Sequence, residues 1–288
     1  MAELYWLSNR SNINVYNYPE QYRYEDDDRR IILYDDHRTL LDVLYFATQE
    51  GLFNGVVPNV ISFDHHDDSV KLSTRMKQRA KAVRKSCFPK RNEEKIWQFV
   101  EFELGVMDDD WVRAGMELGL INHYVGFGHA ADVWNIDSGY EHYKTLDKVV
   151  HHLYSNGHLD GVLGSRGVIG DASYEWAQKR NDLLDDIQYH HGHFDNGEIY
   201  PFVFDVDLDC FSTDCEDHTI AWPEAIFEER YQENYKVSSF VHQLMSRASF
   251  ITICREPGCC GGIGEANRIL EILDYYWFDG ALGTRRIV

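Results

Sequence analysis

Residues 57–68 read Val-Pro-Asn-Val-Ile-Ser-Phe-Asp-His-His-Asp-Asp, a largely apolar run that ends in a dense cluster of acids and histidines. Such a run, bounded by polar residues, is typical of a buried strand. Side chains alternate along a strand, so every second side chain points to the same side. We therefore expect Asp64, His66 and Asp68 to converge.

A second stretch, residues 199–209, has the same form and reads Ile-Tyr-Pro-Phe-Val-Phe-Asp-Val-Asp-Leu-Asp. The same alternation places Asp205 and Asp207 on one side of this strand. Carboxylates crowded in this way repel one another unless a cation neutralises them. The two stretches together therefore predict a site for divalent metal.

Strands and helices are expected to alternate along the chain. Apolar runs predict strands over residues 31–34, 56–63, 121–127, 161–163, 199–204 and 250–254, and helical spacing predicts helices over residues 39–49, 93–104, 110–118, 172–187, 223–245 and 264–276. This alternation predicts an α/β fold with a mostly parallel sheet covered by helices on both faces. Ligands of such folds bind outside the carboxyl ends of the strands, where His37 and both acidic clusters fall. No repeat or low-complexity linker is visible, so we expect one domain over residues 1–288.

The chain carries a formal net charge of −20, which bounds the kind of partner to expect. This charge argues against general nucleic-acid binding, which needs clustered Lys and Arg side chains for phosphate contacts. It favours cationic partners, either metal ions or a positively charged substrate, although acidity also simply keeps proteins soluble.

One basic segment, residues 71–91, breaks the acidic pattern. It contains Lys71, Arg75, Lys77, Arg79, Lys81, Arg84, Lys85, Lys90 and Arg91. We interpret it either as a solvated helix face or loop, or as a docking surface for an acidic peptide.

Several features bear on the compartment. No run of about 18 apolar residues is present, so no membrane span is expected. The N-terminus has an early acid and no apolar signal core, which argues against secretion. The six cysteines show no CxxC pair, and reduced thiols are the simplest interpretation. These features predict a cytoplasmic protein and leave its oligomeric state open.

The ligand types bear on the choice of metal. Aspartate and histidine without thiolate suit Mn2+ or Mg2+ better than a structural zinc ion, and imidazole shifts the balance toward Mn2+, with Fe2+ and Co2+ also compatible. The clusters contain more ligands than one ion needs, so we expect two Mn2+ ions. Two metals about 3.5–4 Å apart activate a shared water for hydrolysis.

The order Asp-x-His-x-Asp, then Phe-Asp-Val-Asp on a later strand, resembles the arginase (ureohydrolase) superfamily. A closer resemblance is to an atypical branch that includes peptide arginases, which convert arginine side chains in ribosomally made peptides to ornithine. The segments that carry it are Ile32–His37, Asp205–Phe211, the pair Asp110-Trp111 ahead of His123, and the turn Glu256–Gly262. The resemblance spans most of the chain and implies a three-layer α-β-α arginase-like fold.

The resemblance also implies a set of site residues. One ion would be held by His37, Asp64, Asp68 and Asp205, and the other by His66, Asp64, Asp205 and Asp207, with Asp64 and Asp205 bridging. Asp68 would accept a proton and pass it to the departing amine, and Glu256 would bind the guanidinium group. His123 is our choice for the histidine that exchanges protons with solvent. Without the resemblance, Glu256 is an exposed loop acid and His123 a core histidine.

Departures from the superfamily pattern bear on the substrate. Enzymes that act on free arginine follow the first motif with a loop that grips the α-carboxylate and α-amine. Here Asp68 is followed by residues 69–74 and the basic segment, and no such loop is recognisable. Asp209 also comes one residue earlier than the last acid of the usual second motif. We therefore expect a hydrolase that converts arginine residues of a peptide to ornithine and urea.

Three alternatives stay open. A small-molecule guanidino or amidine hydrolase, arginase- or agmatinase-like, would keep the metals and differ in the pocket. A metal-dependent deacetylase of the same superfamily would use a single zinc ion, and the presence of both Asp68 and Asp207 argues against it. A non-enzymatic, metal-dependent peptide-binding protein would bind peptide without releasing urea.

Overall fold

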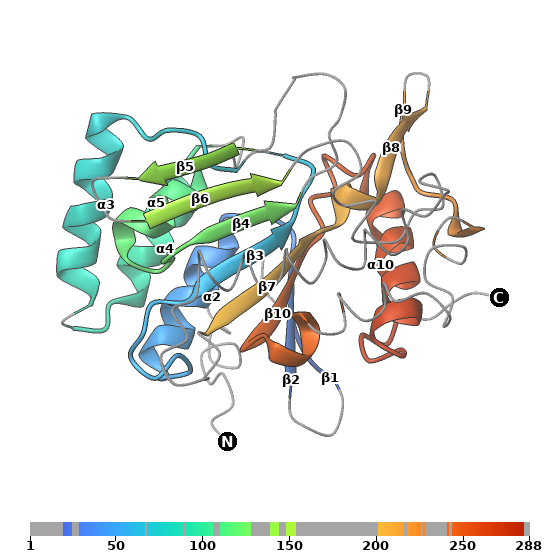
Figure 1. The fold of residues 1–288 in the computed structure, drawn as a ribbon, viewed down its shortest axis with the longest axis horizontal. Helices are drawn as coiled ribbons and strands as arrows, with labels where there is room; N and C mark the ends of the chain where they lie inside the picture. Colours follow the sequence, from blue (N-terminus) through green and yellow to red (C-terminus); the bar gives the residue numbers. More distant parts are fainter. Residues whose placement is uncertain are drawn as a thin grey trace.

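A computed structural model describes residues 20–24, 29–66, 68–88, 90–105, 110–127, 139–143, 148–153, 201–215, 218–225, 227, 241 and 244–284. In this part of the chain, eight strands form one sheet (Figure 1). They are β1 (Glu20–Tyr24), β2 (Arg29–Tyr34), β3 (Asn59–Phe63), β4 (Tyr124–Phe127), β5 (Gly139–Tyr143), β6 (Lys148–Leu153), β7 (Phe202–Asp207) and β10 (Phe250–Cys254).

The strand order in this sheet is β1-β2-β10-β7-β3-β4-β6-β5. Every neighbouring pair from β2 across to β6 is parallel, and β1 and β5 pair antiparallel at the edges. The expected α/β fold with a mostly parallel sheet is thus confirmed. The order reverses between β3 and β7, because the chain runs outward from β3 to β4 and in the other direction from β7 to β10. The residues that follow β3 and β7 therefore meet where open α/β sheets bind ligands.

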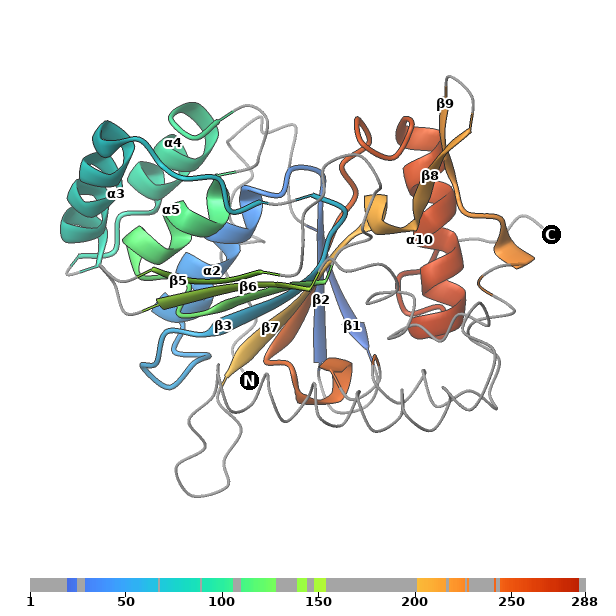
Figure 2. The ribbon, with the colours of Figure 1, turned by 45° about the horizontal axis from the view of Figure 1, so that its top comes forward.

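Helices pack on both faces of the sheet (Figure 2). Of the described helices, α2 (Thr39–Gln49), α3 (Thr74–Cys87), α4 (Glu93–Phe102) and α5 (Trp111–Leu118) lie on one face, and α10 (Ile263–Trp277) lies on the other. Strand β2 serves both cores: Leu33 is buried in the cluster that contains α10, and Ile32 in the cluster that contains α2. Strands buried on both faces are mostly apolar, which explains the apolar runs of the sequence.

The observed bounds agree closely with the expected ones for α2 and β10. Strand β3 begins at Asn59, three residues late, directly after Pro58, which has no N–H to donate to a neighbouring strand. Strand β4 begins at Tyr124, because the chain leaves α5 through Gly119, whose φ of 77° ends the helix in the left-handed conformation. Strands β5 and β6 were not expected, since both mix charged and polar residues with apolar ones.

Some expectations fall on other parts of the chain. The strand over residues 161–163, the helix over residues 172–187 and most of the helix over residues 223–245 lie outside the described residues. Among the described helices, none combines the length and the apolar character needed to cross a membrane. All six cysteines lie in the described part, and each is a free thiol.

A small hairpin supports the turn after β10. Strands β8 (Ser212–Cys215) and β9 (His218–Ala221) pair beyond the short 3-10 helix η2 (Leu208–Phe211). Gly261 has a φ of 85°, and a Cβ there would lie 1.9 Å from the carbonyl oxygen of Thr219. Only glycine fits this close approach, so the turn after β10 packs directly against the backbone of β9.

Candidate metal centre

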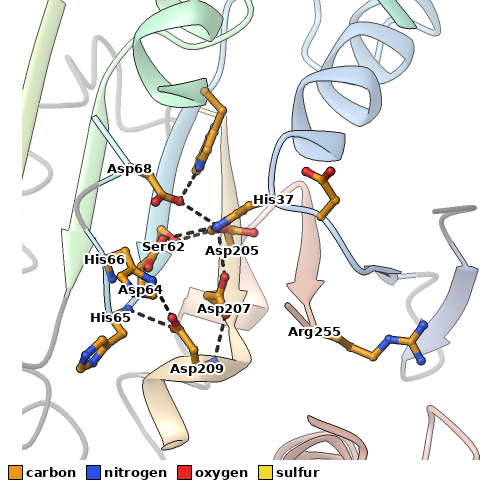
Figure 3. A network of polar contacts seen from close by, with 12 residues as sticks. His37, Ser62, Asp64, His65, His66, Asp68, Asp205, Asp207, Asp209 and Arg255 are labelled. Carbon is orange, nitrogen blue, oxygen red and sulfur yellow. Dashed lines mark hydrogen bonds and ion pairs between the residues drawn. The ribbon is translucent and has the colours of Figure 1, made fainter. Parts of the chain in front are cut away.

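The acidic and imidazole side chains gather at the carboxyl ends of four neighbouring strands, β2, β10, β7 and β3 (Figure 3). His37 follows β2 and Glu256 follows β10. The segment Asp205–Asp209 begins in the last residues of β7 and continues beyond it. The segment Asp64–Asp68 follows β3. The parallel arrangement therefore brings together residues that lie far apart in the sequence.

The imidazole of His37 is buried in the middle of this group, with four carboxylates around it. Its Nε2 atom lies 2.7 Å from Oδ2 of Asp205. Its Nδ1 atom lies 2.8 Å from Oδ2 of Asp68, 3.2 Å from Oδ2 of Asp207 and 3.5 Å from Oδ2 of Asp64. Both acidic clusters thus meet at one histidine, as expected from the sequence.

Asp205 is fully buried and fully hydrogen-bonded. Its Oδ1 atom accepts hydrogen bonds from the hydroxyls of Tyr34, at 3.0 Å, and Thr252, at 2.6 Å. Its Oδ2 atom accepts one from the hydroxyl of Ser62, at 2.7 Å, and lies against the ring of His37. Each oxygen therefore has two partners supplied by the protein itself.

Asp64 and Asp207 present the opposite case. Both carboxylates are buried, and in each of them the Oδ2 atom receives no hydrogen bond from the described residues. Their Oδ1 atoms are held in place by backbone N–H groups, of His66 at 2.7 Å and of Asp209 at 2.9 Å. A buried carboxylate oxygen that accepts no hydrogen bond is costly, and these two share Nδ1 of His37 as a neighbour. Two such atoms in one place fit a bound cation.

Asp68 is positioned by the beginning of α5. The indole N–H of Trp111 donates a hydrogen bond to Oδ2 of Asp68, and the N–H of Val112 donates to its carbonyl oxygen at 3.3 Å. The Trp111 ring also packs against the His37 ring, with 4.6 Å between the ring centroids. The helix that starts at Trp111 thereby fixes both the acid and the histidine.

His66 does not join Asp64 and Asp68 in the way that strand alternation predicts. Strand β3 ends at Phe63, and among the described residues that follow, 65–66 form a bend and 68–69 a turn, so the two-residue period does not continue. The side chain of His66 is 48% exposed, and its Nδ1 atom lies 2.7 Å from Oδ2 of Asp209. His66 and Asp209 therefore form the outer part of the centre, beside the buried part around His37.

Glu256 reaches both parts of the centre. Its carboxylate belongs to a four-donor group with His37, Asp207 and Cys254, and to another with His66, Asp209 and Cys259, in each of which the donor atoms lie within 4.8 Å of one another. Its φ of 32° is unusual for a residue other than glycine, and its carbonyl oxygen accepts the N–H groups of Cys259 and Cys260. Such strained backbone is concentrated at functional sites.

Sequence reasoning missed three residues of the centre: Asp209, Cys254 and Cys259. Asp209 also lies within 4.8 Å of Asp64 and Asp207, donor atom to donor atom. Cys254 is the last residue of β10 and the register partner of Asp207 on β7, so its place in the centre follows from strand pairing and not from a local signal in the sequence. The centre thus includes thiols that the sequence interpretation left out.

Burial and like charge perturb the carboxylates. The pKa of Asp64 is raised well above its usual value by burial and by the charge of Asp68. The pKa of Asp207 is raised well above its usual value by burial and by the charges of Asp209 and Glu256. Burial also raises the pKa of Glu256 to about 7. The raised pKa values favour the protonated form of these acids, and a bound cation would favour the ionised form.

The pKa values of the two histidines are also raised, which favours the charged form of an imidazole. Burial by itself would lower the pKa of His37, but the charges of Asp205 and Asp68 outweigh it and raise that pKa well above the usual value. The hydrogen bond to Asp209 raises the pKa of His66 to about 9. In both cases the neighbouring carboxylates favour the cationic form of the imidazole.

His123 lies elsewhere. It precedes β4, its N–H donates to Oδ1 of Asn59 at 3.1 Å, and its carbonyl oxygen accepts the N–H of Val60 at 2.9 Å. Asn59 begins β3, whereas the centre follows Phe63 at the other end of that strand. The expectation that His123 exchanges protons at the centre disagrees with this placement, because a residue ahead of a parallel strand lies at the opposite edge of the sheet.

The basic segment is partly neutralised by neighbouring acids. An Nη atom of Arg79 lies 2.5 Å from the carboxylate of Glu103, and one of Arg91 lies 2.8 Å from that of Glu50. Much of the segment forms α3, on which buried residues such as Val83 face the core. These contacts agree with a solvated helix face, and a docking role stays a prediction.

No protein-family model matches this chain, and no curated protein matches it. The functional argument therefore depends on the geometry and chemistry of the centre.

Proposed function

We propose that this chain is a hydrolase with two divalent metal ions, preferably Mn2+, that converts arginine side chains of a ribosomally made peptide to ornithine and releases urea. The proposal includes the three-layer arginase-like fold implied by the sequence resemblance. It concerns an enzyme for linear amidines rather than a structural metal protein.

One observation carries the metal part of the proposal. The Oδ2 atoms of Asp64 and Asp207 are buried, accept no hydrogen bond from the described residues, and both lie beside the same nitrogen, Nδ1 of His37. A structural role would give each oxygen its own N–H or O–H donors, as happens for Asp205. Buried carboxylate oxygens that share one imidazole nitrogen are suited to hard divalent ions.

The negative charge of the centre supports a cationic substrate. A guanidinium group stays protonated in proteins, so it enters the site as a cation. Arg255, which follows β10, is turned away from the carboxylates and pairs with Asp35 (Figure 3). Glu256 thus faces the centre without neutralisation from Arg255, and a substrate guanidinium would hold its carboxylate in the ionised form.

The proposed reaction adds one water molecule to the guanidinium carbon. When bound, the two ions supply an activated water and positive charge against the developing negative charge. Glu256 orients the guanidinium group, so that its carbon lies near the aspartates. Asp68 takes a proton from the water as the carbon–oxygen bond forms, and gives it to the ornithine nitrogen as the carbon–nitrogen bond breaks. The products are urea and an ornithine side chain.

The segment after Asp68 supports a peptide as the substrate. The carbonyl oxygen of Ser69 accepts the Nε–H of Arg113 at 2.9 Å, and Asp68 is tied to Val112 through its backbone. These contacts tie the start of the segment to α5. They are in keeping with a site that does not grip the α-carboxylate and α-amine of a free amino acid.

The test is to incubate the Mn2+-loaded protein with arginine peptides whose ends are blocked, and with free arginine, agmatine and an acetyl-lysine peptide. We expect loss of one CH2N2 unit per modified arginine by mass spectrometry, with an equal amount of urea, and a preference for the blocked peptides. Asp207→Ala serves as the inactive control. Unchanged peptides across several sequences, or deacetylation instead, would contradict the proposal.

A further inference from the structure

We infer that the second acidic cluster supplies its metal ligands from Asp207 and Asp209, and that Asp205 is a positioning residue that turns Nδ1 of His37 toward the metal. This inference rests on the proposed metal centre and changes its ligand set. It replaces the assignment of Asp205 as a bridging ligand, which the sequence resemblance implies.

The hydrogen bonds of Asp205 leave it no role in direct ligation. Its carboxylate accepts from the hydroxyls of Tyr34, Thr252 and Ser62, and Nε2 of His37 completes the set at 2.7 Å. These four partners come from three strands and the turn after β2, and all of them are buried. To reach an ion, Asp205 would have to leave at least one buried hydroxyl without an acceptor.

The orientation of His37 follows from this arrangement. With Nε2 directed at Asp205, the other ring nitrogen faces Asp68, Asp207 and Asp64 at 2.8, 3.2 and 3.5 Å. Metal-bound histidines commonly donate their second N–H to a carboxylate, which fixes the tautomer and the ring orientation. The Asp205–His37 pair has this form, so His37 would bind an ion through Nδ1.

The local fold brings Asp209 beside Asp207. Strand β7 ends at Asp207, and the chain turns at once into η2, in which the N–H of Asp209 donates a hydrogen bond to Oδ1 of Asp207 at 2.9 Å. The tight turn keeps the carboxylate of Asp209 close, and Asp64, Asp207 and Asp209 each offer an oxygen within 4.8 Å of the others. Ligand oxygens lie about 2.0–2.2 Å from a divalent ion. Small shifts of these three carboxylates would therefore bring an oxygen of each into contact with one ion.

Asp209 also connects this group to the outer histidine. Its Oδ2 atom lies 2.7 Å from Nδ1 of His66, and its Oδ1 atom accepts the N–H of His65 at 3.2 Å. Asp209 therefore stands between the buried oxygens of Asp64 and Asp207 and the exposed imidazole. A ligand at this point can serve the outer ion together with His66.

The test compares Asp205→Asn, Asp207→Asn and Asp209→Asn for the number and affinity of bound Mn2+ or Co2+ ions, measured by elemental analysis and titration. We expect two ions in the wild type, loss of at least one ion in the Asp207 and Asp209 variants, and two ions in Asp205→Asn with affinity lowered about 10- to 100-fold. If Asp205→Asn loses an ion while the wild type holds two, the inference fails and the metal centre stands. A wild type that binds no ion overturns both.

A second readout does not depend on substituting Asp205. In protein labelled with 15N in histidine and loaded with Zn2+, the ring of His37 is expected to carry its proton on Nε2 and the metal on Nδ1, with His37→Gln used to assign the signal. Thr252→Val, which removes one hydrogen bond from Asp205 and keeps the side-chain shape, should lower affinity without changing the number of ions. Metal on Nε2 of His37 would overturn the inference.

Discussion

Ser62 on β3 and Asp205 on β7 are register partners in adjacent parallel strands, and the Ser62 hydroxyl donates a 2.7 Å hydrogen bond to the Asp205 carboxylate. This contact locks together two segments that lie 143 residues apart. The next positions, Phe63 and Val206, are also partners, so Asp64 and Asp207 follow side by side. The register of these two strands therefore determines which acids meet.

The first prediction concerns the cost of the buried carboxylate of Asp207. Asp207→Asn should abolish binding of at least one ion, and should leave the metal-free protein at least as stable as the wild type at pH 8, because the neutral amide avoids the cost of burial and the repulsion by Asp209 and Glu256 that raise the pKa of Asp207. Thermal and denaturant unfolding with a chelator measure the second effect. A variant less stable than the metal-free wild type would show that Asp207 has a structural role.

The second prediction concerns pH. Asp64 and Asp207 have raised pKa values in the folded protein, so the folded state binds more protons than the unfolded state above about pH 4. The free energy of unfolding of the metal-free protein should therefore fall as pH rises from there through those raised pKa values. His37 acts in the same direction: its pKa is also raised, so the stability that it contributes is present below about pH 6.5 and lost at higher pH.

Thermal unfolding with a chelator at pH 5.5 and pH 8 checks this expectation, with Asp207→Asn as the variant that should respond less. Metal addition should release protons into a weakly buffered solution, because the ligands must deprotonate to bind. Equal stability at both pH values, or higher stability at pH 8, would contradict the assignment of these raised pKa values.

The third prediction concerns the turn that carries Glu256. Gly261→Ala should destabilise the protein by more than 1 kcal/mol, about the cost of placing a side chain in the left-handed region, because the new Cβ would also collide with the Thr219 carbonyl group. Gly258→Ala is the matched control, since a Cβ there meets no atom within 4 Å. Similar unfolding free energies for the two variants would show that the turn adapts freely.

The fourth prediction separates substrate binding from metal binding at Glu256. Glu256→Gln keeps the side-chain shape and removes the charge, so the ion content should stay unchanged while kcat/KM for an arginine peptide falls about 100-fold, the scale of a lost charged hydrogen bond. Loss of an ion in this variant would instead make Glu256 a metal ligand. Activity assays and elemental analysis on the same preparation decide between these results.

The fifth prediction concerns His123. The variant His123→Ala should retain kcat within a few-fold of the wild type, because this residue lies at the amino end of β4, away from the centre. A large loss of kcat with unchanged stability would restore the proton-exchanging role that the sequence resemblance suggested.

The central strands β2, β3, β4, β7 and β10 and the meeting of the two acidic clusters could be predicted from the sequence, because apolar runs that end in ligands are a local signal. The turn after Phe63 could not, and it sends His66 to Asp209 instead of Asp64. The partners of Asp205 depend on the register of β2, β3 and β10, which no single segment encodes. The position of the Cys254 thiol in the centre also depends on this register.

The position of His123 was predictable in principle. In a parallel sheet, a residue just before a strand lies at the amino ends of the strands, and a residue just after a strand lies at their carboxyl ends. This rule places His123 away from Asp64. His123 was chosen because the family motif has a histidine at this point in the residue order. The motif does not say at which end of the strand that histidine lies.

The most direct test of the metal centre is a crystal structure of the Mn2+-loaded protein with anomalous scattering measured at the manganese edge. We expect two anomalous peaks at the carboxyl ends of β3 and β7, one of them in contact with Oδ2 of both Asp64 and Asp207. An empty map at these oxygens, with manganese elsewhere or absent, would contradict the proposed metal centre.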